Sequence, residues 1–257
     1  VDFNFHEVIQ YCAYELGAII RAFRRRAKIV HRGGAGREPL GRAKEARSAM
    51  KQADSPWLFT YRTEGCFSIM IILADIQKSQ TVMDELASYC DFDLGRAARD
   101  SSWITLQPEH PFMVLAGESS GGVFLAYGDG EVDRRPVLYV TSEGQAGCIA
   151  ANLTELIAMM LALPYWRDLL KFSDRGNLQE MRRAARFSEQ DFAEEYAEFP
   201  AARKRILDTL PVPVIADPVK LLHGCVCATD CSVVAEDGWR YDSLFHHFKS
   251  SDNPDWT

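Results

Sequence analysis

Apolar runs separated by glycine-containing turns lie at the centre of the sequence. Residues 112–117 and 123–127 are apolar and flank a short polar stretch, and the second run closes at Gly128-Asp129-Gly130. Another apolar segment lies within residues 135–147. Apolar runs bounded by turn residues predict β-strands, so we expect a strand, a tight turn, a second strand and then a third.

Leucines at helical spacing follow these strands. They lie between residues 153 and 163, ahead of Pro164-Tyr165-Trp166, and Asn152 with Glu155 matches a capping box at the start of a helix. Further elements are expected upstream: strands at 57–61 and 66–73 and a helix at 80–89. Because strands and helices do not alternate regularly, the order indicates an α+β fold, with a mixed or antiparallel sheet flanked by helices. We place this core at residues 55–173.

Residues 1–54 are expected to form a basic helical extension before the core. Apolar positions spaced by threes and fours predict a helix over residues 5–29, and a shorter helix is expected over 42–52. Residues 1–51 contain eleven Lys and Arg against five Asp and Glu, a net charge of +6. Since the whole chain carries −7, the remainder carries −13. The two parts therefore face different partners, or each other.

Residues 174–257 are expected to form a helical and hairpin extension packed on the core. Helices are expected as far as Leu210, basic over 178–187 and acidic over 188–199, followed by a proline-containing spacer. An acidic helix usually presents a solvated face, but this helix is also a candidate binding surface. Its candidate binding residues are Glu189, Asp191, Glu194, Glu195 and Glu198.

Seven cysteines, most of them within apolar runs, indicate a reducing, cytoplasmic environment. No apolar stretch reaches the roughly 20 residues that cross a bilayer, and no signal peptide is recognisable, so no membrane association is expected. We considered His223, Cys225, Cys227 and Cys231 as a zinc site, with Cys225 and Cys227 on one side of a strand. Their spacing is unusual for zinc, so buried thiols in a C-terminal hairpin are preferred, and neither a metal nor a cofactor is predicted.

The segment Gly117-Glu118-Ser119-Ser120-Gly121 matches the G-x-S-x-G motif of serine hydrolases. That motif requires a helix directly after the serine, whereas a strand is expected here. We therefore predict no catalytic residues and assign Gly121 and Gly122 to the positive φ angles of a tight turn. A serine hydrolase built on Ser119, with a histidine such as His223, remains an alternative.

Several short motifs lie around this sheet. Their main residues are Trp103, Gly121, Gly122, Tyr139, Glu143, Gly144 and Trp166. Together these motifs resemble the SUKH superfamily, whose members include immunity proteins of bacterial polymorphic and contact-dependent toxin systems. The resemblance covers about 75 residues, and a weaker similarity is found at 236–245.

The resemblance implies a non-catalytic protein that binds one cognate toxin and blocks its active site or substrate access, with no cofactor. The acidic residues of 188–199 would then contact a basic toxin, one directed at nucleic acids or nucleotides. A regulatory scaffold with several weaker partners is the third alternative. Direct nucleic-acid binding is not expected, because no aromatic residues are interleaved with the basic run near Arg24. The oligomeric state stays open.

Overall fold

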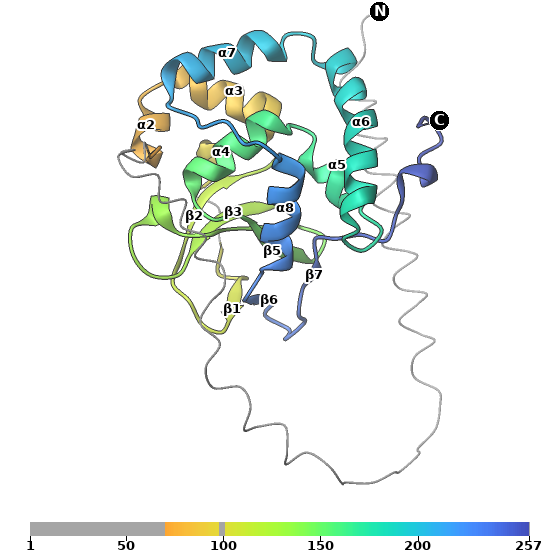
Figure 1. Cartoon of the computed structure of the whole chain (residues 1–257). Helices are drawn as coiled ribbons and strands as arrows, with labels where there is room; N and C mark the ends of the chain where they lie inside the picture. Colours follow the sequence, from red (N-terminus) through yellow and green to blue (C-terminus); the bar gives the residue numbers. More distant parts are fainter. Residues whose placement is uncertain (1–69, 98–100, 257) are drawn as a thin grey trace, which may run out of the picture. The chain divides into compact units, whose positions relative to one another are not determined.

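The computed structural model describes residues 70–97 and 101–256, and its central feature is a five-stranded sheet (Figure 1). The strands lie in the order β2-β3-β4-β5-β7. The first four are antiparallel, and β7 joins the edge of β5 in parallel. Their bounds are β2 Phe112–Gly117, β3 Val123–Tyr127, β4 Val137–Val140, β5 Gln145–Ala150 and β7 Asp242–Ser243. The predicted α+β class with a mixed sheet is confirmed.

Both faces of this sheet are covered. Phe124 and Ala126 of β3 belong to a large core shared with the helices, whereas Val123 and Leu125 belong to a second core on the other face. A two-stranded sheet, β1 (Thr105–Gln107) with β6 (Ser232–Val234), supplies part of that second core. Successive side chains of a strand point to opposite faces, so a strand covered on both sides is apolar throughout. This explains the continuous apolar runs of β3 and β4.

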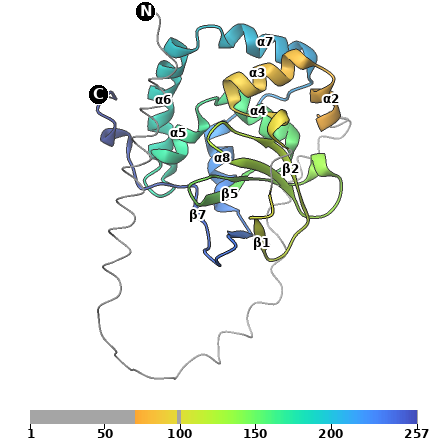
Figure 2. The same cartoon turned by 180° about the vertical axis from the view of Figure 1, so that it is seen from behind.

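The helices lie mainly over the face of the sheet that carries the larger core (Figures 1 and 2). Among residues 70–97 and 101–256, every helix is too short or too polar to cross a lipid bilayer. The helix bounds are α2 Leu73–Gln77, α3 Gln80–Cys90, α4 Leu153–Ala162, α5 Trp166–Lys171, α6 Leu178–Glu195, α7 Phe199–Thr209 and α8 Pro218–Cys227.

Side-chain caps fix where several of these helices begin. The Asn152 side chain accepts a hydrogen bond from the Glu155 backbone N at 2.9 Å, which confirms the predicted cap of α4. The Glu155 carboxylate reaches the backbone N of Ala151 at 2.8 Å, one residue earlier than a standard capping box. Asp217 caps α8 by accepting from the Lys220 backbone N at 3.0 Å.

Two predicted strands are wrong in the described part of the chain. The strand expected over 66–73 is not formed at 70–72, and Leu73 instead begins α2. The predicted hairpin strand with Cys225 and Cys227 is also wrong, because residues 218–227 form α8. Its start carries the Asp217 cap and a proline in the first turn, both of which favour a helix. Short apolar runs do not distinguish strands from buried helical segments.

The acidic helix expected over 188–199 is the second half of α6, which ends at Glu195. Glu198 instead lies at the N-cap position of α7. The predictions for residues 5–29, 42–52 and 57–61 lie outside the described residues. The limits placed on the three segments of the chain remain predictions.

Candidate functional site

The turn between β2 and β3 lies at the centre of a polar network. The turn closes with a hydrogen bond from the Glu118 backbone N to the Gly122 carbonyl at 3.0 Å. Gly121 has a φ of +111°, which favours glycine, as expected. Gly122 is required for a different reason: a Cβ there would lie 2.7 Å from Glu118 Oε1 and 2.9 Å from the Val140 carbonyl oxygen. Gly122 does not have a positive φ angle, so the prediction that both glycines supply one is wrong for Gly122.

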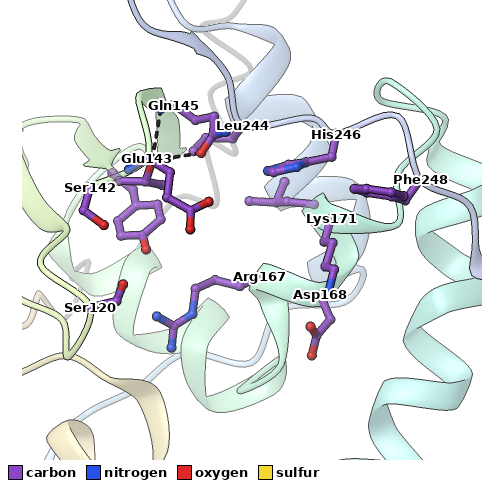
Figure 3. A pocket seen from close by; sticks show the side chains of 13 residues that line it. Ser120, Ser142, Glu143, Gln145, Arg167, Asp168, Lys171, Leu244, His246 and Phe248 are labelled. Carbon is purple, nitrogen blue, oxygen red and sulfur yellow. Dashed lines mark hydrogen bonds between the residues drawn. The ribbon is translucent and has the colours of Figure 1, made fainter. Parts of the chain in front are cut away.

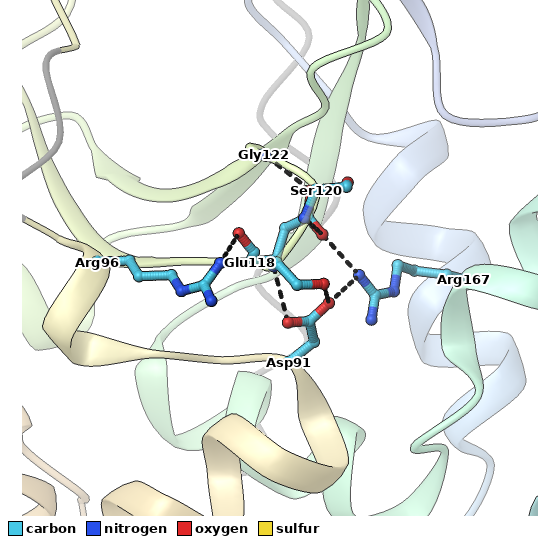
Figure 4. A network of polar contacts seen from close by, with 7 residues as sticks. Asp91, Arg96, Glu118, Ser120, Gly122 and Arg167 are labelled. Atoms are coloured by element: carbon cyan, nitrogen blue, oxygen red, sulfur yellow. Dashed lines mark hydrogen bonds and ion pairs between the residues drawn. The ribbon is translucent and has the colours of Figure 1, made fainter. Parts of the chain in front are cut away.

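The Glu118 carboxylate is buried inside this turn and accepts several hydrogen bonds (Figure 4). The Gly122 backbone N donates to Oε1 at 2.7 Å, and the Ser120 hydroxyl donates to the same oxygen at 2.5 Å. The Ser120 backbone N donates to Oε2 at 3.1 Å. A buried carboxylate is tolerated where donors converge on it, so Glu118 organises the turn from within.

Arg167 of α5 joins Glu118 to Asp91, the residue that follows α3. Its Nη1 lies 2.9 Å from Asp91 Oδ2 and 3.2 Å from Glu118 Oε2 (Figure 4). Burial tends to raise the pKa of Asp91, but Arg167 and the hydrogen bonds from Ser119 outweigh it and hold that pKa below its usual value. Burial raises the pKa of nearby Tyr139 to about 12, so its phenol stays neutral. The network therefore contains two carboxylates that share one guanidinium.

Ser119 is held by Asp91. Its backbone N donates to Asp91 Oδ1 and its hydroxyl donates to Asp91 Oδ2, both at 2.9 Å. The turn leads into β3, so the expected strand after the G-x-S-x-G motif is confirmed. In the described part of the chain no histidine bonds to Ser119, and His223 Nε2 instead lies 2.8 Å from the Gly176 carbonyl oxygen. These contacts give the hydrolase alternative no support at Ser119.

A hollow of about 440 Å³ opens on the β4 side of the network, and we term it the β4 hollow (Figure 3). Arg167, Asp168 and Lys171 of α5 line it together with Glu143 and His246. Burial is the largest influence on His246 and lowers the pKa of this imidazole. The lining therefore mixes acidic and basic groups and has no dominant charge.

A second hollow, of about 540 Å³, lies between α3, α5 and α6, and we term it the α6 hollow. Its lining residues include one cation, Arg167, which it shares with the β4 hollow. The surrounding protein displaces water from Asp168 and raises its pKa, against the opposing influence of Lys171 and Arg167. The other charged and aromatic lining residues are Asp91, Asp168, Asp191, Glu195, Tyr89, Tyr165, Phe192 and Tyr196.

The five predicted acidic residues are all exposed, but they do not all line one hollow. Asp191 and Glu195, one helical turn apart, line the α6 hollow, and Glu189 lines a neighbouring apolar hollow of about 340 Å³. Asp191 Oδ2 accepts a hydrogen bond from the Trp256 ring at 2.6 Å, which ties the C-terminal segment to α6. Glu194 accepts a bond from Gln190 at 3.1 Å.

The residues that carry the family resemblance have structural positions. Trp166 is fully buried at the start of α5, and the Tyr139 ring packs against it with centroids 5.0 Å apart. Trp103 stacks on Tyr241 at 6.3 Å. Glu143 and Gly144 form the turn between β4 and β5, where Gly144 has a φ of +88°.

The residues considered for zinc do not converge. Cys225 Sγ lies 3.7 Å from the Glu155 carboxylate, Cys227 is exposed, and Cys231 is buried. The Cys227 sulfur lies 3.7 Å from His223 Nε2 within α8. Over residues 70–97 and 101–256, no cluster of three or more potential metal ligands is present.

Sequence reasoning missed four residues of this region: Asp91, Arg167, Asp168 and Ser188, the last of which also lines the α6 hollow. Arg167 and Asp168 directly follow the Trp166 motif, but nothing in the sequence pairs Arg167 with Asp91, 76 residues away. No family model, curated protein or solved structure matches the chain. The SUKH resemblance therefore stays a prediction, and a function has to be inferred from the site.

Proposed function

We propose that this protein is a cytoplasmic immunity protein, which binds one cognate toxin domain and blocks it by occupancy. The observation that supports this is the uncompensated negative charge around the end of α6. Residues 188–199 contain five carboxylates and no Lys or Arg. In the described part of the chain, none of the five belongs to an ion pair.

This arrangement has a local cost. Asp191 and Glu195 are like charges at i and i+4 on one helix, a spacing that destabilises a helix by about 0.2–0.5 kcal/mol. A surface of one sign attracts a basic partner and accelerates its association, which suits a protein that must capture a toxin quickly. A toxin active site that binds the phosphates of nucleic acids or nucleotides would carry basic groups, and carboxylates would take the place of those phosphates.

The first test is purification of the tagged full chain from its native source at low salt. We expect one partner in stoichiometric amount. The partner gene should arrest growth when expressed alone, and co-expression of this protein should restore growth. A stoichiometric partner that is not toxic would contradict the immunity proposal, and several substoichiometric partners would favour the scaffold alternative.

A charge-neutralised variant tests the surface itself. Glu189, Glu194 and Glu198 are changed together to Gln, and the control changes three exposed acids outside α6: Glu109, Glu131 and Glu236. Both variants alter net charge by the same amount. Loss of electrostatic steering should lower the association rate about tenfold in the first variant and much less in the control. Equal effects would assign the attraction to net charge alone.

A further inference from the structure

We propose that the α6 hollow is an anchor pocket for the guanidinium group of an arginine side chain from a protein partner. This inference rests on the proposed function and specifies the chemistry of the contact. Charge, an unpartnered buried hydroxyl and aromatic rings support it independently.

The charge of the lining favours a cation. Four carboxylates and one guanidinium line the hollow, and that guanidinium is already shared between Asp91 and Glu118. Asp168 makes no ion pair or hydrogen bond through its carboxylate in the described residues. An entering cation can therefore pair with Asp168 and Glu195 without breaking an existing contact at Asp168.

Ser188 supplies the second observation. It lies on α6 and lines the hollow, yet only 2% of its surface is exposed. Its Oγ has no hydrogen-bond partner among the described residues. A buried polar atom without a partner is costly, and an N–H donor from a ligand in the hollow would satisfy it.

Aromatic rings give the hollow its preference for a planar cation. Phe192 stacks on Tyr196 with ring centroids 4.6 Å apart, and Tyr165 packs against Phe192 at 6.1 Å. A guanidinium group stacks on aromatic faces and presents five N–H donors in a fixed plane, whereas an ammonium group is a compact, strongly hydrated charge. Arginine therefore matches rings, hydroxyl and carboxylates better than lysine does.

The pocket is tested by titrating the full chain with small probes. Calorimetry or NMR monitors the binding. The probe is N-acetyl-arginine amide, and its control is the citrulline analogue, which has nearly the same shape but no charge. We expect a dissociation constant of about 1 mM for the arginine probe and at least about tenfold weaker binding of the citrulline probe. Equal binding of the two would overturn the proposal.

Further probes distinguish a side chain from a free metabolite. Free L-arginine carries an α-ammonium and an α-carboxylate in place of the two capping amides, and its net charge equals that of the capped probe, so it should bind no more tightly than the capped probe. Tighter binding of free arginine or of spermidine would overturn the assignment to a protein side chain. The capped lysine probe should bind several-fold more weakly than the arginine probe, and equal binding would refute the preference for a planar cation.

Two variants locate the binding. Glu195→Gln should weaken binding of the arginine probe about tenfold. Glu236 is an exposed acid outside the hollow, so Glu236→Gln should leave the affinity for the probe unchanged. Ser188→Ala removes a hydroxyl that bonds to nothing described, so the fold should keep or gain stability while probe affinity falls about threefold. A merely structural Ser188 would leave affinity unaltered.

The outcomes separate this inference from the proposed function. Probe binding without a toxic partner would keep the pocket and reject the immunity proposal. A toxic partner whose affinity is insensitive to Glu195→Gln and Ser188→Ala would keep the proposed function and reject the arginine anchor.

Discussion

Replacement of Arg167 by Gln should destabilise the protein by about 2–3 kcal/mol, because it leaves two carboxylates without their shared cation. Asp91 and Arg167 are 23% and 37% exposed, so solvent screening limits their pair to about 0–1 kcal/mol. Glu118 is 2% exposed, and losing the partner of a buried charge costs about 3–5 kcal/mol when nothing else compensates. Here the bonds from Ser120 and Gly122 remain, which reduces that cost to about 2 kcal/mol.

Urea unfolding measures this effect through tryptophan fluorescence, since Trp166 is buried directly beside Arg167. A double-mutant cycle with Glu118→Gln isolates the interaction between the two side chains, with an expected coupling of about 1–2 kcal/mol. The control is Arg134→Gln, which breaks an exposed ion pair, 68% and 77% exposed, and should cost less than about 0.5 kcal/mol.

The pH dependence of stability gives an independent check of the contribution of Asp91. The folded protein holds the pKa of Asp91 below its usual value, so this group contributes stability at pH values above the unfolded pKa of about 3.9. That contribution is lost as the pH falls through the lower, folded value. Arg167→Gln removes the main cause of the depression, so the stability difference from wild type should shrink below about pH 4. A cost below about 0.5 kcal/mol at neutral pH, or zero coupling, would refute the reasoning.

Three further predictions concern the turn, the thiols and the C-terminal segment. Gly122→Ala should lower the free energy of unfolding in urea by more than about 2 kcal/mol, because the new Cβ would meet backbone and carboxylate oxygens. Gly128→Ala is the control: its φ is +94° and no atom lies within 4 Å of the new Cβ, so it should cost about 1 kcal/mol. Among the five cysteines of the described residues, iodoacetamide followed by peptide mapping should modify exposed Cys227 first and leave Cys90 unmodified, since burial raises the pKa of the latter to about 12; the reverse order would refute this. Trp256→Phe should lower stability by about 1 kcal/mol through loss of the ring N–H bond to α6, and an unchanged melting temperature would show that this bond contributes nothing.

The sequence was sufficient for the elements whose signals are local. The β2 and β3 strands are apolar runs around a glycine turn, and the Asn152 cap of α4 lies within three residues of the group that it bonds. The parallel strand β7 was not predicted, because its two residues are exposed and are defined by pairing with β5, about 100 residues earlier. Long-range pairing of so short a strand has no pattern of its own.

The α8 helix shows a different kind of failure. Asp217 and Pro218 were available as a helix start signal, but the alternation of Cys225 and Cys227 was given more weight and favoured a strand. A helical cap has a direct physical cause, whereas two cysteines at alternate positions have none unless they share a ligand. The candidate site was predicted only in part. The acidic residues of α6 were predicted, but the hollow beside them was not, because it depends on tertiary contacts with α3 and α5.

In the α6 hollow, the position of Arg167 disfavours an anionic ligand. Arg167 is the one cation among the lining residues, and its Nη1 is held by Asp91 and Glu118, so an anionic ligand would have to compete with two carboxylates for the same group. A cationic ligand faces no such competition, because it adds to carboxylates that one guanidinium only partly neutralises. Since Glu118 also fixes the turn from within, the same network that stabilises the fold keeps the negative lining in place. Under the proposed function, stability and partner selection thus depend on the same three side chains, and the acidic lining of the α6 hollow is built on a rigid base.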